Sequence, residues 1–284
     1  MDQAEQITPP VAHHGEGPVW WVGWGGLRWV DMLAGDVLSL APDGQVSRRH
    51  VDRVVAAMRP RAAGGSVFAV ERGFALDAGD GSPLRHLGEL WSGADVRFND
   101  GSCDPHGRFY CGSMAYDEAA GRGALYCLEP DHTTRLMFSG VTVSNGLEWA
   151  PDGSRAYYVD SPTQRIDVFD YDAGSGLSNR RTLVEIPTAS GAPDGLTVDA
   201  EGGIWVALWG GRAVHRYGPD GRLDAVVPVP VTHVTACTFG GSQLDELFIT
   251  TSRSALGPAD EPRAGALFRV VPGIRGLPAR TYGG

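Results

Sequence analysis

The sequence contains no lysine, so all 24 of its basic residues are arginine. This absence excludes enzymes that form a Schiff base through lysine, pyridoxal phosphate enzymes and nucleotide-binding loops that depend on a lysine. A high-GC coding bias also favours arginine over lysine. The absence therefore excludes functions without assigning one.

Basic runs and long apolar runs are also missing. With 34 acidic residues the net charge is −10, which disfavours binding to nucleic acids or anionic membranes. No apolar stretch is long enough to span a bilayer, and the first ten residues lack the basic and apolar parts of a signal peptide. We expect a soluble cytoplasmic protein, a monomer or weak dimer, without a nucleic-acid or membrane partner.

Several catalytic and cofactor motifs are absent too. The sequence has no H-E-x-x-H zinc motif, no G-x-S-x-G serine context, and no G-x-G-x-x-G placed between a strand and a helix. The four cysteines form no C-x-x-C pair, so we expect reduced, partly buried thiols rather than disulfides; they are Cys103, Cys111, Cys127 and Cys237.

What the sequence does contain is a repeat. One template, with a small polar opening, an apolar alternation, a Gly turn and an aromatic-rich run, recurs about every 40 to 50 residues. Its six copies begin at Gly15, Val54, Asn99, Ser144, Pro193 and Thr235. Each copy continues into a second pair of alternating runs joined by Asp-Gly or Asn-type turns, which are typical of antiparallel hairpins.

Four short strands in each of six units predict an all-β fold, a six-bladed β-propeller formed by residues 1–284 as a single domain. A β-sandwich is the competing fold, but it does not explain the repeated template. We expect the N-terminal segment to close the ring as an outer strand of the last blade. The eight tryptophans are expected to pack between blades, with Trp149, Trp205 and Trp209 as alternatives for a pocket wall.

Equivalent positions in the six units should form a ring around the central axis. The residue that opens the template is Glu16, Asn99, Asn145 and Asp194 in four of the units. Such carboxylates and amides would repel one another unless a divalent cation lay among them. All-oxygen ligands favour Ca²⁺, with Mn²⁺, Mg²⁺ and Zn²⁺ as alternatives. The sequence thus predicts an axial metal site, although Asn-Gly and Asp-Gly are also ordinary turn formers.

At these residues the chain resembles the senescence-marker-protein/gluconolactonase/luciferin-regenerating-enzyme family, and in particular its regucalcin-like sugar lactonases. The resemblance rests on "GEGPVW" from Gly15, "RFNDGSCDPHGRFYCGSM" from Arg97, "SNGLEWAPDG" from Ser144 and "PDGLTVDAEGGIWVA" from Pro193. It implies a six-bladed propeller with one divalent metal on the axis and, in many members, hydrolysis of sugar lactones.

Carried over residue by residue, the resemblance implies the metal ligands Glu16, Asn145 and Asp194, with Asp194 also the catalytic base. It implies substrate binding by Arg97 and Asn99, and by Asp117, which is one methylene shorter than the Glu of that family.

These assignments predict a metal-dependent lactonase, a carboxylic-ester hydrolase that opens a sugar (aldono)lactone to its hydroxy acid. One alternative is a promiscuous ester or organophosphate hydrolase that uses the same axial metal. Another is a calcium-binding propeller without catalysis, because a fold does not determine a function.

Overall fold

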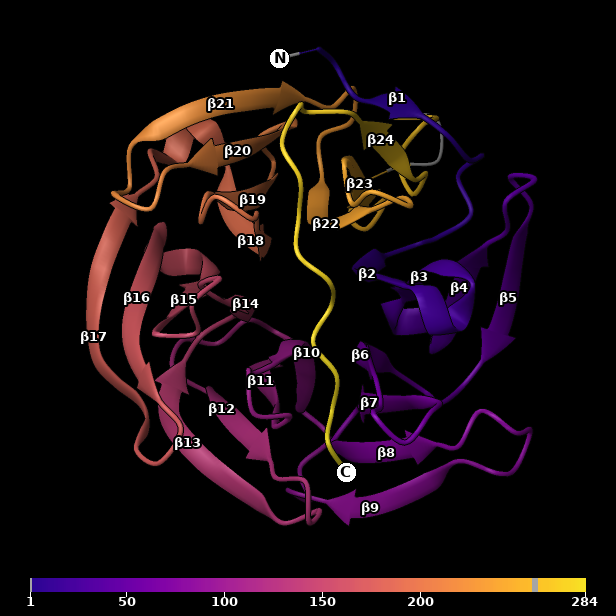
Figure 1. Ribbon diagram of the computed structural model, residues 1–284, viewed down its shortest axis with the longest axis vertical. Helices are drawn as coiled ribbons and strands as arrows, with labels where there is room; N and C mark the ends of the chain where they lie inside the picture. The colour runs from indigo at the N-terminus through magenta and orange to yellow at the C-terminus, as the bar shows by residue number, and fades with distance from the viewer. Residues whose placement is uncertain (1, 257–259) are drawn as a thin grey trace.

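The computed structural model describes residues 2–256 and 260–284. Its strands form six four-stranded antiparallel sheets, which surround a central axis as blades (Figure 1). The all-β six-bladed propeller predicted from the repeat is therefore confirmed.

The first three blades follow one another along the chain, each with its innermost strand first. Blade 1 comprises β2 (Gly15–Trp21), β3 (Gly26–Asp31), β4 (Asp36–Leu40) and β5 (Val46–His50). Blade 2 comprises β6 (Val55–Pro60), β7 (Ser66–Val70), β8 (Gly73–Asp77) and β9 (Arg85–Glu89). Blade 3 comprises β10 (Val96–Cys103), β11 (Phe109–Ala115), β12 (Gly123–Leu128) and β13 (Thr134–Val141).

The last three blades include the one that closes the ring. Blade 4 comprises β14 (Ser144–Trp149), β15 (Arg155–Asp160), β16 (Arg165–Asp172) and β17 (Gly176–Glu185). Blade 5 comprises β18 (Ala192–Val198), β19 (Ile204–Trp209), β20 (Ala213–Tyr217) and β21 (Leu223–Pro228). Blade 6 comprises β22 (Val234–Gly240), β23 (Glu246–Thr251), β24 (Phe268–Val270) and the N-terminal β1 (Glu5–Gln6). The expected closure by an N-terminal outer strand is confirmed.

Burial within a blade changes from the axis outward. β7 is buried along its whole length, whereas β5, an outermost strand, is mostly exposed. Middle strands pack between two neighbouring blades and therefore read as nearly continuous apolar runs, while outer strands can be polar.

The hydrophobic core is divided among the blade interfaces. Each of its six clusters combines residues from two adjacent blades, including blades 6 and 1 across the closure. Trp29, Trp149 and Trp205 are fully buried in three of these clusters, as expected for tryptophans that pack between blades. All four cysteines are buried and their thiols are unpaired.

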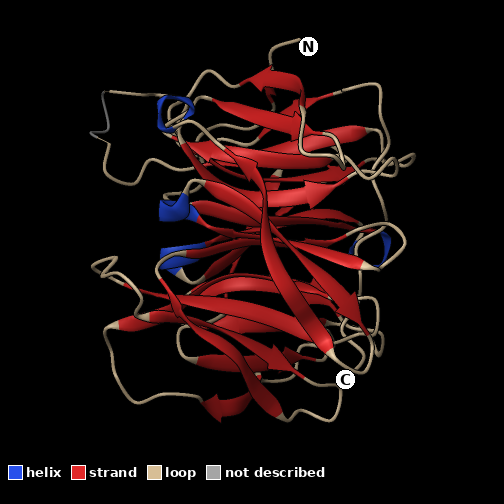
Figure 2. Cartoon of the chain, turned by 90° about the vertical axis from the view of Figure 1, so that its left-hand side faces the viewer, coloured by secondary structure: helices blue, strands red, loops and turns tan. Residues whose placement is uncertain are grey.

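In the described part of the chain, helical structure is limited to short 3₁₀ turns, visible beside the strands in the edge-on view of Figure 2. The described turns are η1 (Val22–Trp24), η2 (Met32–Ala34), η3 (Ser161–Thr163) and η4 (Thr188–Ser190). Over the described residues, no helix has the length and apolar character needed to cross a bilayer.

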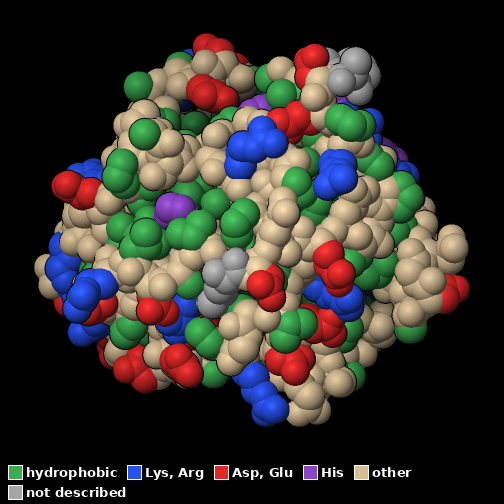
Figure 3. All heavy atoms as spheres, turned by 90° about the horizontal axis from the view of Figure 1, so that it is seen from above, with side chains coloured by type: hydrophobic (Ala, Val, Ile, Leu, Met, Phe, Trp, Pro, Cys, Tyr) green, Lys and Arg blue, Asp and Glu red, His purple; other side chains and the backbone are tan. Residues whose placement is uncertain are grey.

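Charged side chains of both signs are interspersed on the face shown in Figure 3. Many of them pair across strands, as Arg269 of β24 does with Glu5 of β1, where Nη2 and Oε1 are 2.6 Å apart. Exposed pairs of this kind contribute little to stability. Most of the net acidic charge is therefore ordinary solvated surface.

Candidate active site

The innermost strands are irregular near one end of the axis. The pairing register with the second strand shifts between Glu16 and Val19 in blade 1 and between Ser144 and Leu147 in blade 4. Equivalent shifts occur between Phe98 and Gly101 and between Pro193 and Leu196. A β-bulge frees a residue from the ladder and redirects its side chain.

The small residues of the template allow the inner strands to approach one another at these bulges. A Cβ atom on Gly195 would lie 2.5 Å from the Cβ of Ala236 and 2.9 Å from the carbonyl oxygen of Thr235 in the next blade. On Gly146 it would lie 2.8 Å from the carbonyl oxygen of Asp194. Only glycine tolerates such contacts, so the repeated Asn-Gly and Asp-Gly pairs reflect close packing at the axis.

The bulges bring the predicted ring residues together around one cavity of about 190 Å³. The predicted residues that line this active-site cavity are Glu16, Arg97, Asn99, Asn145 and Asp194. Thr235, the equivalent residue in blade 6, instead uses its hydroxyl to donate a hydrogen bond to the Gly15 carbonyl at 2.6 Å.

Glu16 and Asp194 are two buried carboxylates on facing strands of this cavity. Burial and the nearby charge of Asp194 raise the pKa of Glu16 well above its ordinary value. Burial and the charge of Asp100 raise the pKa of Asp194 in the same way. Both pKa shifts show that two negative charges are poorly solvated here unless a cation compensates them.

Asn145 supplies a further oxygen. Its Nδ2 donates a hydrogen bond to Oγ of Ser161 at 3.0 Å, which leaves Oδ1 as a buried acceptor without a partner. A buried carbonyl oxygen without a donor is costly, and a cation would satisfy it. Across residues 2–256 and 260–284, no three His, Cys, Asp or Glu side chains are arranged to hold a metal ion. The set that fits a cation here is two carboxylates and one amide.

Arg97 brings a positive charge to the cavity wall. Its Nη1 donates to Oδ1 of Asn99 at 2.6 Å and to the carbonyl oxygen of Phe98 at 3.0 Å. Nε of Arg97 is buried without an acceptor. Asn99 in turn donates from Nδ2 to the carbonyl oxygen of Ser144 at 2.9 Å, which ties blade 3 to blade 4. The pair is thus held rigidly at the cavity wall.

Asp117, the third residue expected to contact substrate, is placed differently. It is exposed, and its Oδ1 accepts a hydrogen bond from the backbone N–H of Ala119 at 3.1 Å. The next residue, Glu118, adopts a left-handed backbone conformation with φ 56° and lines the cavity. In this short loop the turn points Asp117 outward and places Glu118 at the cavity. The structure therefore favours Glu118 as the acidic residue facing a ligand.

An apolar wall completes the cavity, and Trp209 is the one of the three tryptophans considered for a pocket wall that lines it. His14 and Trp209 lie there in edge-to-face contact, with ring centroids 6.0 Å apart, and Trp209 stacks on His233 at 3.8 Å. Nδ1 of His14 is 2.8 Å from Oγ of Ser252. Further lining residues of this apolar wall are Met114, Val143, Pro162 and Ala192.

Comparison with known proteins identifies the family of this chain. Residues 14–253 match the family model of the SMP-30/Gluconolactonase/LRE-like region. The chain belongs to this family. It is 36% identical to regucalcin of Oryctolagus cuniculus over 293 aligned positions, covering 99% of this chain and 98% of that protein.

Two solved structures agree with this chain over nearly its whole length. A luciferin-regenerating enzyme superposes with a TM-score of 0.91 at 29% identity, covering 99% of both chains. A regucalcin from Agrobacterium tumefaciens, described as a calcium-binding protein, superposes with a TM-score of 0.92 at 26% identity and covers 99% of this chain and 98% of its own. Membership of this family supports a lactonase-type function.

Proposed function

We propose that this protein is a metal-dependent hydrolase that opens a sugar (aldono)lactone to its hydroxy acid. The observation that carries the proposal is the meeting of two buried carboxylates and a partnerless amide oxygen beside a buried arginine in one small cavity. The gluconolactonase membership of the family supports the same reaction class.

In this proposal Glu16, Asn145 and Asp194 hold one divalent cation. Their hard oxygen atoms favour Ca²⁺ over softer metals, with Mn²⁺, Mg²⁺ and Zn²⁺ as alternatives. The calcium-binding description of the Agrobacterium relative supports this choice. When bound, such a cation supplies Lewis-acid polarisation of the lactone carbonyl and neutralises developing negative charge.

The remaining residues position the substrate. The Arg97 guanidinium lines the cavity and can donate to a ring or hydroxyl oxygen. Glu118 can accept hydrogen bonds from sugar hydroxyls on the same side of the cavity. Held between them, the lactone would present its carbonyl toward the carboxylate pair.

Asp194 is placed to take the proton from the attacking water, because its carboxylate borders the cavity in which the lactone would lie. Ring opening transfers one hydroxyl to the carbonyl carbon and breaks the bond to the ring oxygen. The proton held by Asp194 then returns to that ring oxygen, which becomes the hydroxyl of the product.

The test is lactone opening followed by pH-stat titration, with gluconolactone, pentonolactones and a phosphotriester as substrates and Ca²⁺ supplied. We expect the lactones to be opened, and Asp194→Asn to lower the rate by about 100-fold or more. Asp43→Asn, a matched change in an exposed turn, should leave the rate unchanged.

Two results would contradict the proposal. Equal catalytic efficiency on the phosphotriester would favour the promiscuous hydrolase. Calcium binding without turnover of any substrate in the panel would favour a non-catalytic calcium-binding propeller.

A further inference from the structure

A second cavity, larger than the first, lies at the opposite end of the same inner strands. Its volume is about 310 Å³. On β14, Asn145 belongs to the active-site cavity and Glu148 to this second cavity, so the two are three positions apart, at most about 10 Å along the strand. The second cavity is therefore distinct from the proposed active site, although the same blades build both.

The C-terminal segment crosses this end of the axis as a strap, defined here as residues 276–284 (Figure 1). On one side the N–H of Gly276 donates to the carbonyl oxygen of Leu244 at 2.7 Å. On the other side the N–H of Tyr282 donates to the carbonyl oxygen of Pro60 at 2.8 Å, and the Tyr282 ring is fully buried. The strap is thus anchored at both ends.

Between these anchors the strap forms one wall of the second cavity. Leu277, Pro278, Ala279 and Arg280 all line it. Among the residues that the structure describes, the one hydrogen bond made by this stretch runs from Nη2 of Arg280 to the carbonyl oxygen of Ala150, at 3.1 Å.

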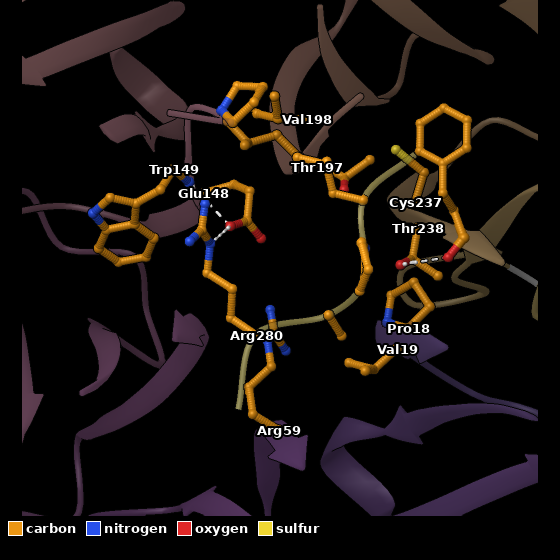
Figure 4. A pocket seen from close by; sticks show the side chains of 16 residues that line it. Pro18, Val19, Arg59, Glu148, Trp149, Thr197, Val198, Cys237, Thr238 and Arg280 are labelled. Carbon is orange, nitrogen blue, oxygen red and sulfur yellow. Dashed lines mark hydrogen bonds and ion pairs between the residues drawn. The ribbon is translucent and has the colours of Figure 1, made fainter. Parts of the chain in front are cut away.

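Two arginines give the cavity a charged side. Arg59 points from β6 toward the strap, while Arg280 turns toward Glu148 (Figure 4). Arg280 and Glu148 are paired loosely, with Nε and Oε1 3.7 Å apart. Glu148 also accepts a hydrogen bond from the hydroxyl of Ser102 at 3.1 Å. The carboxylate of this cavity is therefore already engaged by protein groups.

Arg59 has no such partner. Its Nη1 donates to the neighbouring Met58 carbonyl at 2.7 Å, and within the described part of the chain no carboxylate lies within ion-pair distance of it. The charge of Arg59 does reach the buried Asp100, which lies outside the cavity lining. An arginine in a cavity wall with free donors is a ready partner for a carboxylate.

Apolar side chains form part of the remaining lining. Val19, Leu196, Val198 and Phe239 line the cavity, and the Thr197 and Thr238 side chains enter it from two neighbouring blades (Figure 4). A ligand that suits both the arginine side and the apolar side chains of this cavity carries one anionic group and an apolar body.

We propose that this second cavity is a binding site for a small organic carboxylate with an apolar body, whose carboxylate pairs with Arg59 beneath the strap. Arg280 lies beside it as a second donor. The inference does not depend on the lactonase reaction, because no residue of the active-site cavity takes part.

The test is isothermal titration calorimetry of the full chain with octanoate and phenylacetate as probes. We expect saturable binding to the wild type, weakened about tenfold or more by Arg59→Gln because a charge-assisted contact is lost. Arg122→Gln, at an exposed arginine paired with Asp95, is the matched control and should bind as the wild type does. Asp194→Asn should also retain full binding, which separates this site from the proposed active site.

Several outcomes would overturn the proposal. These are the absence of saturable binding to the wild type, unchanged affinity in Arg59→Gln, or loss of binding in Asp194→Asn. Octanol or inorganic phosphate binding as tightly as octanoate would show that the carboxylate or the apolar body contributes nothing. If Arg59→Gln melts far below the wild type, Arg280→Gln takes its place with the same expectation.

Discussion

At the residue scale, the carboxylates Glu16 and Asp194 are unfavourable for folding in the absence of a counter-ion. Each is buried, and the negative charge of one carboxylate makes ionisation of the other less favourable. Nothing in the packing of β2 or β18 requires a carboxylate at these positions, since Thr235 fills the equivalent position in blade 6 by bonding to backbone. The cation that we propose would provide the physical reason for both.

A prediction at the residue scale concerns the short loop after β11. Because Glu118 lines the active-site cavity and Asp117 is exposed, Glu118→Gln should raise KM for a sugar lactone by about threefold to tenfold with a smaller change in kcat. Asp117→Asn in the same loop is the matched control and should leave both constants near their wild-type values. A larger effect from Asp117→Asn, measured by steady-state kinetics, would restore the assignment implied by the family resemblance.

The position of Glu118 could not be predicted from the sequence. The family resemblance aligns Asp117 with an acidic residue that lies in a longer loop in other members. Whether Asp117 or Glu118 lines the cavity depends on the turn, in which Glu118 has a left-handed backbone conformation. Trp209 lines the cavity, in agreement with the alternative that made it part of a pocket wall. Its contact with His14 could not be predicted, because the two residues are far apart in the sequence and meet only in the folded chain. The ring residues were predictable because they occupy one repeat position in four blades.

At the element scale, the bulged inner strands explain why the template carries glycine after the polar residue. The backbone of Gly195 has no unusual φ angle, so the cost of a side chain there is purely steric. The bulge positions the polar residue and the glycine lets the next blade close against it.

Gly195→Ala tests this explanation. The added methyl group would collide with Ala236 and the Thr235 carbonyl, so we expect a loss of about 1–3 kcal/mol in the free energy of unfolding. We also expect lactone opening to slow by more than about tenfold, because Asp194 is displaced. Gly174→Ala is the control, since its Cβ would come no closer than 3.4 Å to another atom. Wild-type stability and activity in Gly195→Ala would contradict the role assigned to the bulge.

The outer edge of blade 1 gives a pH-dependent prediction. Burial acts to raise the pKa of Asp36, but hydrogen bonds from Arg48 and His50 on β5 outweigh it and hold that pKa below its ordinary 3.8. A lowered pKa means that the stabilisation by Asp36 is complete above pH 3.8 and is lost as the pH falls through the lower folded-state value. Asp36→Asn should therefore lower Tm by a few degrees at pH 7.

The difference in Tm between wild type and Asp36→Asn should shrink as the pH falls below about 4, measured by thermal melts at several pH values. Asp43→Asn, in the exposed turn between β4 and β5, serves as the control. A difference that grew toward acid pH would show that the ion pair with Arg48 does not set the pKa of Asp36.

At the scale of the whole molecule, the six interfaces between blades carry the core, and the chain closes the ring with both of its ends. The repeat predicted the number of blades, and the expected N-terminal outer strand of the last blade is present as β1. The strap was not predictable, because residues 276–284 have no strand periodicity and their place is set by contacts such as Tyr282 with Pro60. A sequence repeat predicts the strands that recur in every blade. The strap occurs once, so only its tertiary contacts fix its position.

The whole-molecule arrangement also separates two cavities at opposite ends of one axis. The sequence drew attention only to the end marked by Glu16, Asn145 and Asp194. The second cavity depends on Arg59 in blade 2, where the template is most degenerate, and on the strap. Arg59 and Glu148 do occupy one repeat position, three residues after the ring position. Their charges are opposite, however, and the strap has no repeat equivalent, so the pattern alone did not indicate a site.

The measurement that tests the central claim most directly is the metal content of the purified protein after gel filtration, determined by elemental analysis for the wild type and for Glu16→Gln/Asp194→Asn. The account predicts about one divalent cation per chain in the wild type, none retained in the double variant, and lactone opening that is lost on chelation and restored by Ca²⁺. A wild-type protein that holds no divalent cation when Ca²⁺ is supplied, or that opens lactones at full rate after chelation, would contradict it.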